Sequence, residues 1–259
     1  WKNASVHCFR RGIVFLDMLP STVVVYTSFL KTKGPVFVGG FGLESYDRIW
    51  RDAPDAIYNS FLFAIIAVTF ITITSGLISY VIVRRDTKAA AAIDFLMMVP
   101  YLVPGVVMAI GFVTVFRNGM PNFFGPAFLL VMIYYIRRLP YGVRSTTSSL
   151  RQIKPSLEEA AVNLGATPLG AFVKITVPLI FPGIVVGALM SFITAINELS
   201  STLILYDAGT ITMPVKVYLA VLDGEFGLAA ALSTILLLST GACVYAVFRF
   251  AENRNSAFI

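Results

Sequence analysis

Long apolar stretches, each separated from the next by a shorter polar segment, run through the whole of this sequence. A helix that crosses a lipid bilayer needs about 20 predominantly apolar residues. The stretches that are long enough lie at residues 12–30, 57–83, 93–116, 122–140, 180–205 and 226–249. The pattern predicts an all-α membrane protein in which residues 1–259 form a single transmembrane domain with six membrane-spanning helices.

The composition supports a membrane location. Hydrophobic residues make up 57% of the chain, the mean hydropathy is +0.81, and only 13% of the residues are charged, whereas about 25% are charged in an average soluble domain. The formal net charge of +6 is compatible with nucleic-acid binding, but the basic residues lie at the ends of the apolar stretches. We therefore expect membrane lipids around the chain and no nucleic-acid partner.

The distribution of Lys and Arg predicts the orientation of the chain in the membrane. Arg10 and Arg11 precede the first stretch, and most other basic residues follow the second, fourth and sixth, including Arg137 and Arg138 after the fourth. Cytoplasmic loops carry the excess of Lys and Arg in membrane proteins. Both termini, and the polar segment after the fourth stretch, are therefore predicted to face the cytoplasm.

That polar segment is the longest interruption of the apolar pattern, and we expect a cytoplasmic loop at residues 141–178 within it. Ser156 followed by Glu159 has the spacing of a capping box, which predicts the start of a helix. An apolar stripe at helical spacing comprises Leu157, Ala160, Ala161 and Leu164. Gly165 is predicted to end this helix, because glycine adopts the left-handed conformation of a helix C-terminus.

A second short helix is predicted directly afterwards. Thr167 and Pro168 have the order of an N-cap residue followed by proline in the first turn. The apolar positions of this helix are Leu169, Phe172 and Ile175, and Pro178 and Pro182 are expected to close the segment. A helix–glycine turn–helix unit with an apolar face, held between two membrane spans, needs a partner other than lipid.

Two further regions carry candidate pathway residues. The third stretch contains Pro100, Pro104, Gly105 and Gly111. Proline removes a backbone donor and bends a helix, and broken backbone is tolerated in a membrane only next to protein or water. The bend at Pro104 and Gly105 is expected either to line a pathway or to be a packing kink.

The fifth stretch contains polar residues near its end, with Asn197 and Glu198 followed by Ser201. An ionisable side chain at mid-bilayer costs about 2.5–3.5 kcal/mol on insertion scales. We therefore expect Glu198 near the outer end of this stretch, where the cost is lower. It is a pathway or gate candidate, with a plain interfacial carboxylate as the alternative, and Asp17 in the first stretch raises the same question.

The outer loops are predicted to contain short helices. Phe41–Trp50 has the pattern of a short helix on the membrane surface, with Trp50 at the interface; a plain amphipathic connector is the alternative. Residues 209–224 are expected to form a second outer helix and a turn before the sixth stretch.

The polar segment also carries a family resemblance. Glu159-Ala160-Ala161, then Gly165 after three residues, then Ile175-Thr176-Val177-Pro178 after nine more, resembles the EAA-x3-G-x9-I-x-L-P signature of binding-protein-dependent ABC importer permeases; Val177 stands where Leu is usual. The resemblance implies a type I importer permease fold and a loop that docks into a cleft of an ATPase subunit. The coupling residues that follow are Ser156, Leu157, Glu158, Glu159, Ala160, Ala161, Leu164, Gly165, Ile175 and Pro178.

By this resemblance, the chain is the transmembrane subunit of an ATP-driven importer in the bacterial cytoplasmic (inner) membrane. Its expected partners are ABC ATPase subunits, a periplasmic or lipid-anchored solute-binding protein and a second permease half. A second copy of this chain, a related subunit or the other part of a fused double-length permease is expected to supply that half. The fused permease is considered because the chain begins at Trp1 without Met.

The expected solute is ferric iron or a related small anionic or metal solute, because residues 198–218 resemble ferric-iron and phosphonate-type permeases. Permeases for polyamine, thiamine, phosphonate or sulfate are the alternatives within the family.

The motifs that the chain lacks limit the remaining functions. It has no G-x-x-x-x-G-K-[ST] sequence, so ATP and Mg²⁺ are expected in the partner ATPase rather than here. It has neither G-x-S-x-G nor H-E-x-x-H. With one histidine and no cysteine pair, no metal site, cofactor or catalytic residue is predicted. An intramembrane enzyme using Glu198 or Asp17, or a membrane receptor, is the alternative of another class.

Overall fold

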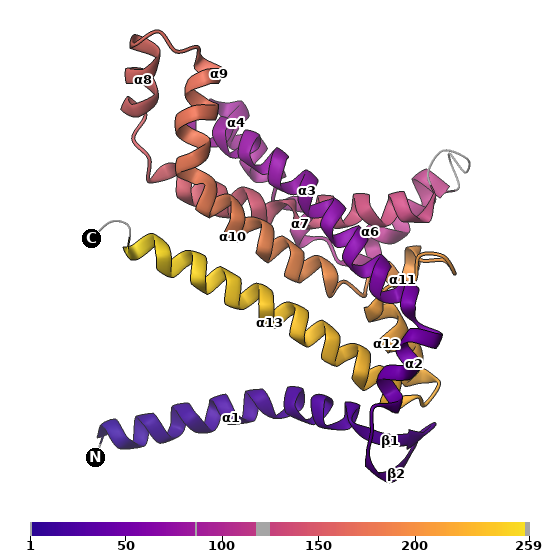
Figure 1. The fold of residues 1–259 in the computed structure, drawn as a ribbon. Helices are drawn as coiled ribbons and strands as arrows, with labels where there is room; N and C mark the ends of the chain where they lie inside the picture. Colours follow the sequence, from indigo (N-terminus) through magenta and orange to yellow (C-terminus); the bar gives the residue numbers. More distant parts are fainter. Residues whose placement is uncertain (1, 86, 118–124, 257–259) are drawn as a thin grey trace. The chain divides into compact units, whose positions relative to one another are not determined.

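The computed structural model describes residues 2–85, 87–117 and 125–256 (Figure 1). They form two compact units. Of the described residues, the first unit comprises 2–59 and 211–239, and the second comprises 60–85, 87–117, 125–210 and 240–256.

The first unit contains helices and one two-stranded sheet. Its elements are α1 (Lys2–Ser28), β1 (Leu30–Lys33), β2 (Val36–Phe41), α2 (Glu44–Asp52), the start of α3 (Pro54–Arg84), α12 (Met213–Leu222) and the start of α13 (Phe226–Ser256). The second unit holds the remainder of α3 and α13. Its other elements are α4 (Lys88–Leu96), α5 (Val99–Leu102), α6 (Gly105–Phe112), the π-helix η1 (Val113–Arg117), α7 (Pro126–Arg151), α8 (Ser156–Asn163), α9 (Pro168–Ala171), the π-helix η2 (Phe172–Thr176), α10 (Val177–Ile196) and α11 (Thr202–Leu205).

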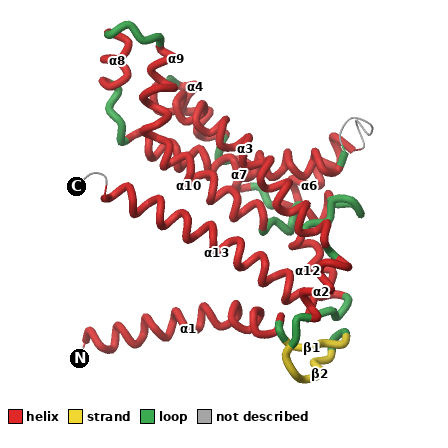
Figure 2. The backbone as a smooth tube through the Cα atoms, in the orientation of Figure 1, coloured by secondary structure: helices red, strands yellow, loops and turns green. Residues whose placement is uncertain are grey.

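The β1–β2 hairpin corrects the expectation of an all-α chain (Figure 2). The strands pair antiparallel, with Lys33 opposite Val36, and Gly34 takes a positive φ of 58° in the turn. A Gly-Pro turn followed by β-branched and aromatic residues favours a hairpin. The residues that carry this signal lie in an outer loop for which the sequence pattern predicted only a short helix.

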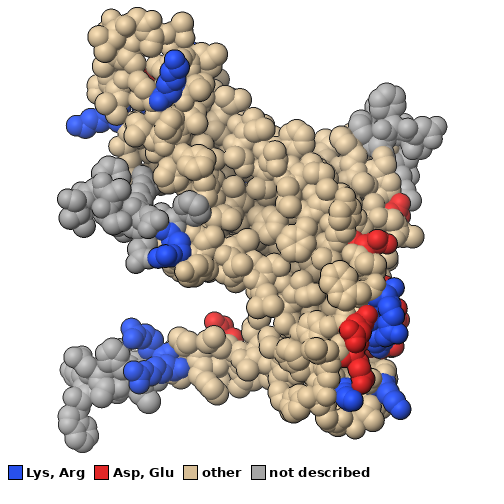
Figure 3. Space-filling model, in the orientation of Figure 1, with Lys and Arg blue, Asp and Glu red and all other residues tan. Residues whose placement is uncertain are grey.

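Both predicted outer helices are present in the first unit, as α2 and α12. In α2, Ile49 is buried whereas the next residue, Trp50, is 69% exposed. An ion pair of 2.5 Å between Arg48 and Glu225 ties α2 to the residue before α13. Figure 3 shows acidic and basic side chains gathered over the α2 region, while most of the remaining visible face carries neither.

The core of the second unit is the contact between α7 and α10. Glycines allow these two helices to approach closely: a Cβ atom at Gly187 would lie 3.0 Å from the Cα atom of Gly142, and one at Gly183 would clash with the Ser149 side chain. The Ser145 hydroxyl donates a hydrogen bond of 2.7 Å to the carbonyl oxygen of Gly183. Small residues at a helix interface are typical of membrane proteins, because they bring the backbones together.

Three helices among the described residues are long and apolar enough to cross a membrane: Pro54–Arg84, Pro168–Ile196 and Phe226–Arg249. The pair Lys88–Leu102 and Gly105–Phe116 adds a fourth candidate if it is counted as one broken span. In α7 the charges of Arg137 and Arg138 lower the hydropathy. Several membrane-spanning helices are therefore present, and a total of six stays a prediction.

The predicted bend in the third apolar stretch is confirmed. The helices on either side of it meet at an angle of 99°. Val103 has the extended conformation that a following proline imposes, and Pro104 is the N-cap residue of α6.

Candidate functional site

The helices α8 and α9, together with the turn that joins them, form a hairpin at one end of the second unit, which we call the α8–α9 hairpin (Figure 1). α8 starts at Ser156 as predicted, but the capping box is absent. Pro155 already has the helical φ of −57°, so its carbonyl oxygen accepts the first helical hydrogen bonds, from the backbone N–H groups of Glu158 and Glu159. Ser156 therefore lies inside the helix rather than at its cap.

The end of α8 is confirmed at Gly165. This residue has a φ of +94°. Its N–H group donates to the carbonyl oxygen of Val162 at 2.9 Å, and the N–H group of Ala166 donates to that of Ala161 at 3.0 Å. These two bonds are the pair expected of a Schellman motif. The turn between α8 and α9 is thus fixed by backbone geometry that favours glycine.

The start of the second helix is confirmed, but its predicted end is wrong. The Thr167 hydroxyl accepts a hydrogen bond of 3.1 Å from the N–H group of Gly170, and Pro168 is the first helical residue. The helix does not stop at Pro178 or Pro182 but continues through η2 into α10, so that Pro168–Ile196 is continuous. Pro178 lies in the first turn of α10, where a missing N–H group costs little. The hairpin is therefore a direct extension of a candidate membrane span.

An apolar surface of the α8–α9 hairpin is uncovered. The exposed apolar side chains are Leu157, Val162, Leu164, Leu169 and Val173, and Leu164 is 89% exposed. Glu159 and Ala160 are also exposed. Burying such side chains is favourable by about 1.5–3 kcal/mol for each large one. Leu157, Leu164 and Leu169 belong to the predicted apolar face, whereas its predicted members Phe172 and Ile175 are half-buried. Val173 lies in η2, directly after the hairpin.

Glu158 lies on the other side of α8 and contacts α3. Its carboxylate accepts hydrogen bonds from the Tyr80 hydroxyl at 2.8 Å and from Arg84 at 2.9 and 3.1 Å. Burial by itself would raise the pKa of the Glu158 carboxyl, but its interactions with Tyr80, Thr176 and Arg84 outweigh this effect and lower the pKa below its ordinary value. The sequence contained no signal for this contact, because its partners lie far away in the chain.

A cavity of about 290 Å³ opens beside this contact. Its lining residues are Tyr80, Glu158, Glu159, Val162, Asn163, Pro168 and Ala171. The two carboxylates make its lining acidic, and one of them is already neutralised by Arg84.

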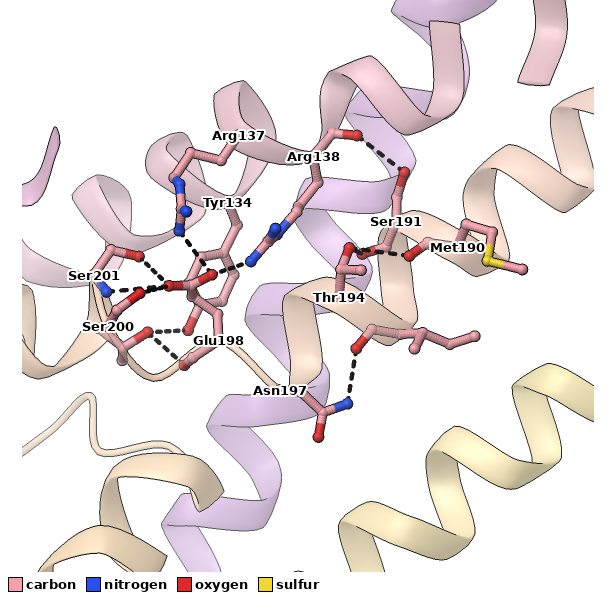
Figure 4. Close-up of polar contacts among 12 residues, drawn as sticks. Tyr134, Arg137, Arg138, Met190, Ser191, Thr194, Asn197, Glu198, Ser200 and Ser201 are labelled. Atoms are coloured by element: carbon pink, nitrogen blue, oxygen red, sulfur yellow. Dashed lines mark hydrogen bonds and ion pairs between the residues drawn. The ribbon is translucent and has the colours of Figure 1, made fainter. Parts of the chain in front are cut away.

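The second cluster of predicted residues surrounds Glu198, which lies between α10 and α11 and is only 4% exposed (Figure 4). Arg137 lies 2.8 Å from its carboxylate, and Arg138 also pairs with it. The Ser200 and Ser201 hydroxyls donate hydrogen bonds of 2.8 and 2.9 Å to the same carboxylate. Glu198 is thus the buried counter-ion of two arginines.

The structure brings some of the pathway candidates together and separates others. Gly105 contacts the cluster, since a Cβ atom at this position would lie 2.7 Å from Nη1 of Arg137. Asn197 is exposed and instead donates hydrogen bonds to the carbonyl oxygen of Ile193 and to the hydroxyl of Thr240. Pro104 is exposed beside Gly105.

One pair of expectations must be corrected. Arg137 and Arg138 were placed in the cytoplasmic flank of the fourth stretch, and Glu198 was placed near the outer end of the fifth. These placements cannot both hold, because the three side chains are in contact. The arginines are pairing partners of a buried carboxylate, which a count of Lys and Arg along the sequence cannot reveal.

No cluster of three or more His, Cys, Asp or Glu side chains that could hold a metal ion occurs within the described part of the chain. The two sites thus consist of an exposed apolar surface and a buried ion-pair cluster.

The sequence of residues 73–256 matches the family model described as the binding-protein-dependent transport system inner membrane component. The chain belongs to this family. The resemblance carried by Glu159, Gly165 and Pro178 is thereby confirmed, and the family is one of transport components rather than enzymes.

Curated relatives have different solutes in their names. The chain is 28% identical over 198 residues to the ferric transport system permease protein FbpB of Actinobacillus pleuropneumoniae, covering 76% of this chain. It is 27% identical over 237 residues to the putrescine transport system permease protein PotI of Escherichia coli K12, covering 89% of this chain and 84% of PotI. The chain spans only 28% of the length of FbpB.

Solved structures show the fold. A bacterial ABC transporter involved in the import of the acidic polysaccharide alginate superposes with a TM-score of 0.73 at 16% identity, over 98% of this chain and 95% of that one. The MetNI methionine ABC transporter, in an inward-facing conformation, gives a TM-score of 0.62 at 16% identity, over 82% of this chain and 99% of that one. The chain has the fold of an ABC importer permease.

Proposed function

We propose that this chain is the transmembrane subunit of an ABC importer, in which it lines the solute pathway and docks on an ATPase through the α8–α9 hairpin. The observation that carries the proposal is the exposed apolar surface of the hairpin, with Leu164 at its tip and a continuous helix from Pro168 to Ile196 behind it. Movement of a subunit bound to Leu164 would be passed to α10 without an intervening flexible loop.

The proposed assembly has four kinds of component. ABC ATPase subunits bind ATP and Mg²⁺ on the cytoplasmic side, so that this chain itself needs no cofactor. A second permease half completes the pathway, and a solute-binding protein delivers solute at the opposite face. The chain lies in the bacterial inner membrane with both termini in the cytoplasm.

Ferric iron is the solute that we propose first, supported by the similarity to FbpB. Putrescine is the second candidate, because the alignment with PotI covers most of both chains. The two solutes can be separated by measuring which of them binds to the solute-binding protein that co-purifies with the complex.

Docking is tested by co-purification of the permease with its ATPase. Leu164→Asp should abolish co-purification, because it places a charge in an interface that buries an apolar side chain. Gln152→Asp, at an exposed position before the hairpin, is the matched control and should retain the ATPase. Equal retention by both variants, or labelling of a cysteine at position 164 by an impermeant reagent from the outside, would contradict the proposal.

A further inference from the structure

Two adjacent glutamates on α8 point to different surroundings. Glu159 is exposed on the outside of the α8–α9 hairpin, whereas the Glu158 side chain is only 13% exposed and faces α3. Both belong to the segment that the sequence assigned to ATPase coupling, but only Glu159 is available to another subunit. Glu158 is already occupied by groups of its own chain.

The contact between Glu158 and α3 has several parts. Arg84 donates two hydrogen bonds to the Glu158 carboxylate and a third, of 3.2 Å, to the carbonyl oxygen of Ile153, just before α8. The Tyr80 hydroxyl donates to the same carboxylate, while its ring packs edge-on against Phe172 of η2 with centroids 4.7 Å apart. Tyr80 and Arg84 thus bind α8, and the Tyr80 ring also contacts η2, which continues from α9.

Within the described residues, α8 also packs against its neighbours α9 and η2. The large apolar side chains of α8, which include Leu157 and Val162, are exposed rather than packed on α3. Charge-assisted hydrogen bonds to a carboxylate are stronger than neutral ones. The rigid guanidinium of Arg84 donates two of them, from Nε and Nη2, to one oxygen of Glu158, while Tyr80 donates to the other oxygen. The hydrogen bonds of Glu158 to Tyr80 and Arg84 are the contacts that join α8 directly to α3.

We propose that Tyr80 and Arg84 clamp Glu158 so that the α8–α9 hairpin and the cytoplasmic end of α3 move as one body during the transport cycle. This inference rests on the proposed function. The hairpin then has two connections to the membrane domain: its covalent continuation into α10, and the clamp onto α3. Two connections on different helices prevent the hairpin from pivoting about α10 alone, so that ATP-driven movement reaches both helices.

The clamp predicts a distance that stays constant while the ATPase works. Spin labels at Asn163→Cys on α8 and Val81→Cys on α3, both at exposed positions, in a Cys8→Ser, Cys243→Ser background, report the separation of the two helices in the complete complex. We expect the same narrow distance distribution without nucleotide and with ATP plus vanadate. Arg84→Met should broaden the distribution and make it respond to nucleotide.

The functional readout is the amount of ferric iron transported for each ATP hydrolysed. Arg84→Met removes both charge-assisted hydrogen bonds to Glu158. It should lower this ratio at least about tenfold, the factor that corresponds to losing one such bond. Tyr80→Phe removes one bond and should have a smaller effect, and Arg84→Lys should restore part of the ratio by keeping the charge. Arg85→Met removes the same charge from the neighbouring exposed residue and should leave the ratio unchanged.

The outcomes separate the clamp from the proposed function. A wild-type chain that retains no ATPase overturns the proposed function. A wild-type complex that hydrolyses ATP but changes the distance between α3 and α8 overturns the clamp alone. The clamp is also wrong if Arg84→Met matches the wild type in distance and in transport per ATP, or if Arg85→Met has the same effect as Arg84→Met.

Discussion

Arg137 of α7 and Glu198, which follows α10, form an ion pair with 2.8 Å between Nη1 of the guanidinium and the carboxylate. Arg138 approaches the same carboxylate, so two positive charges share one negative charge in a buried place (Figure 4). The Nε atoms of both arginines have no hydrogen-bond partner among the described residues. Glu198 is therefore the group on which the burial of both arginines depends.

Replacing Glu198 by Ala should destabilise the protein strongly. Removing one partner of a buried ion pair leaves an uncompensated charge and costs about 3–5 kcal/mol. Thermal unfolding in detergent should show a large fall in the midpoint. Glu44→Ala, which breaks an exposed ion pair of 3.2 Å with Lys31, is the control and should cost no more than about 1 kcal/mol. Equal midpoints for the two variants would show that the cluster is not important for stability.

Gly105 should tolerate no side chain, because Arg137 and Ser200, which both contact Glu198, occupy the space beside it. A Cβ atom there would lie 2.5 Å from the Ser200 hydroxyl and 2.7 Å from Arg137. Gly105→Ala should cost about 1–3 kcal/mol, as overpacking does, and thermal unfolding measures it. Gly111→Ala, in the same helix with nothing within 4 Å of the added atom, should be neutral or stabilising. A neutral Gly105→Ala would refute the close approach.

Gly165→Val should impair the docking of the ATPase. A non-glycine residue in the left-handed region costs about 1–2 kcal/mol, and a β-branched residue is the least suited to it. The turn between α8 and α9 should therefore open, with loss of co-purified ATPase and of uptake. Gly165→Asn should retain more activity, because asparagine accepts this conformation more readily. Wild-type uptake by the valine variant would argue against a fixed hairpin turn.

The ion pair between Arg48 and Glu225 should weaken in acid. The hydrogen bond from Arg48 lowers the pKa of the Glu225 carboxyl below its ordinary value of 4.5. The ion pair therefore contributes fully to the stability of the folded protein above pH 4.5. This contribution is lost as the pH falls through the lowered pKa that the Glu225 carboxyl has in the folded protein. Hydrogen exchange of α2 in the wild type and in Glu225→Gln measures this effect. The two proteins should differ at neutral pH and converge in acid; a difference that persists in acid would exclude this titration.

Local signals in the sequence predicted the elements that depend on neighbouring residues. The turn at Gly165, the cap at Thr167 and the bend at Pro104 were all predicted correctly, because each depends on the backbone within a few residues. The failures at Ser156 and Pro178 are equally local. Pro155 rather than Ser156 is the N-cap residue of α8, and a proline in a first helical turn did not end the helix.

Contacts between distant segments were beyond the reach of these signals. The sequence suggested Glu198 as a special residue, because a carboxylate in an apolar stretch is costly, but it could not identify Arg137 and Arg138 as its partners. In the same way, Glu158 was grouped with Glu159 because the two are neighbours in one motif. Their different burial follows from the contact of Glu158 with Tyr80 and Arg84 of α3, which leaves Glu159 exposed.

The sequence by itself determined that this is a helical membrane protein of the importer permease family, because apolar length and a motif of fixed spacing are both properties of the linear chain. Only the tertiary structure decided which charges are paired. Arg137 meets Glu198, and Arg84 meets Glu158, because helices remote in sequence pack side by side in the second unit. A buried charge needs a nearby opposite charge, and only the folded chain specifies which one is near.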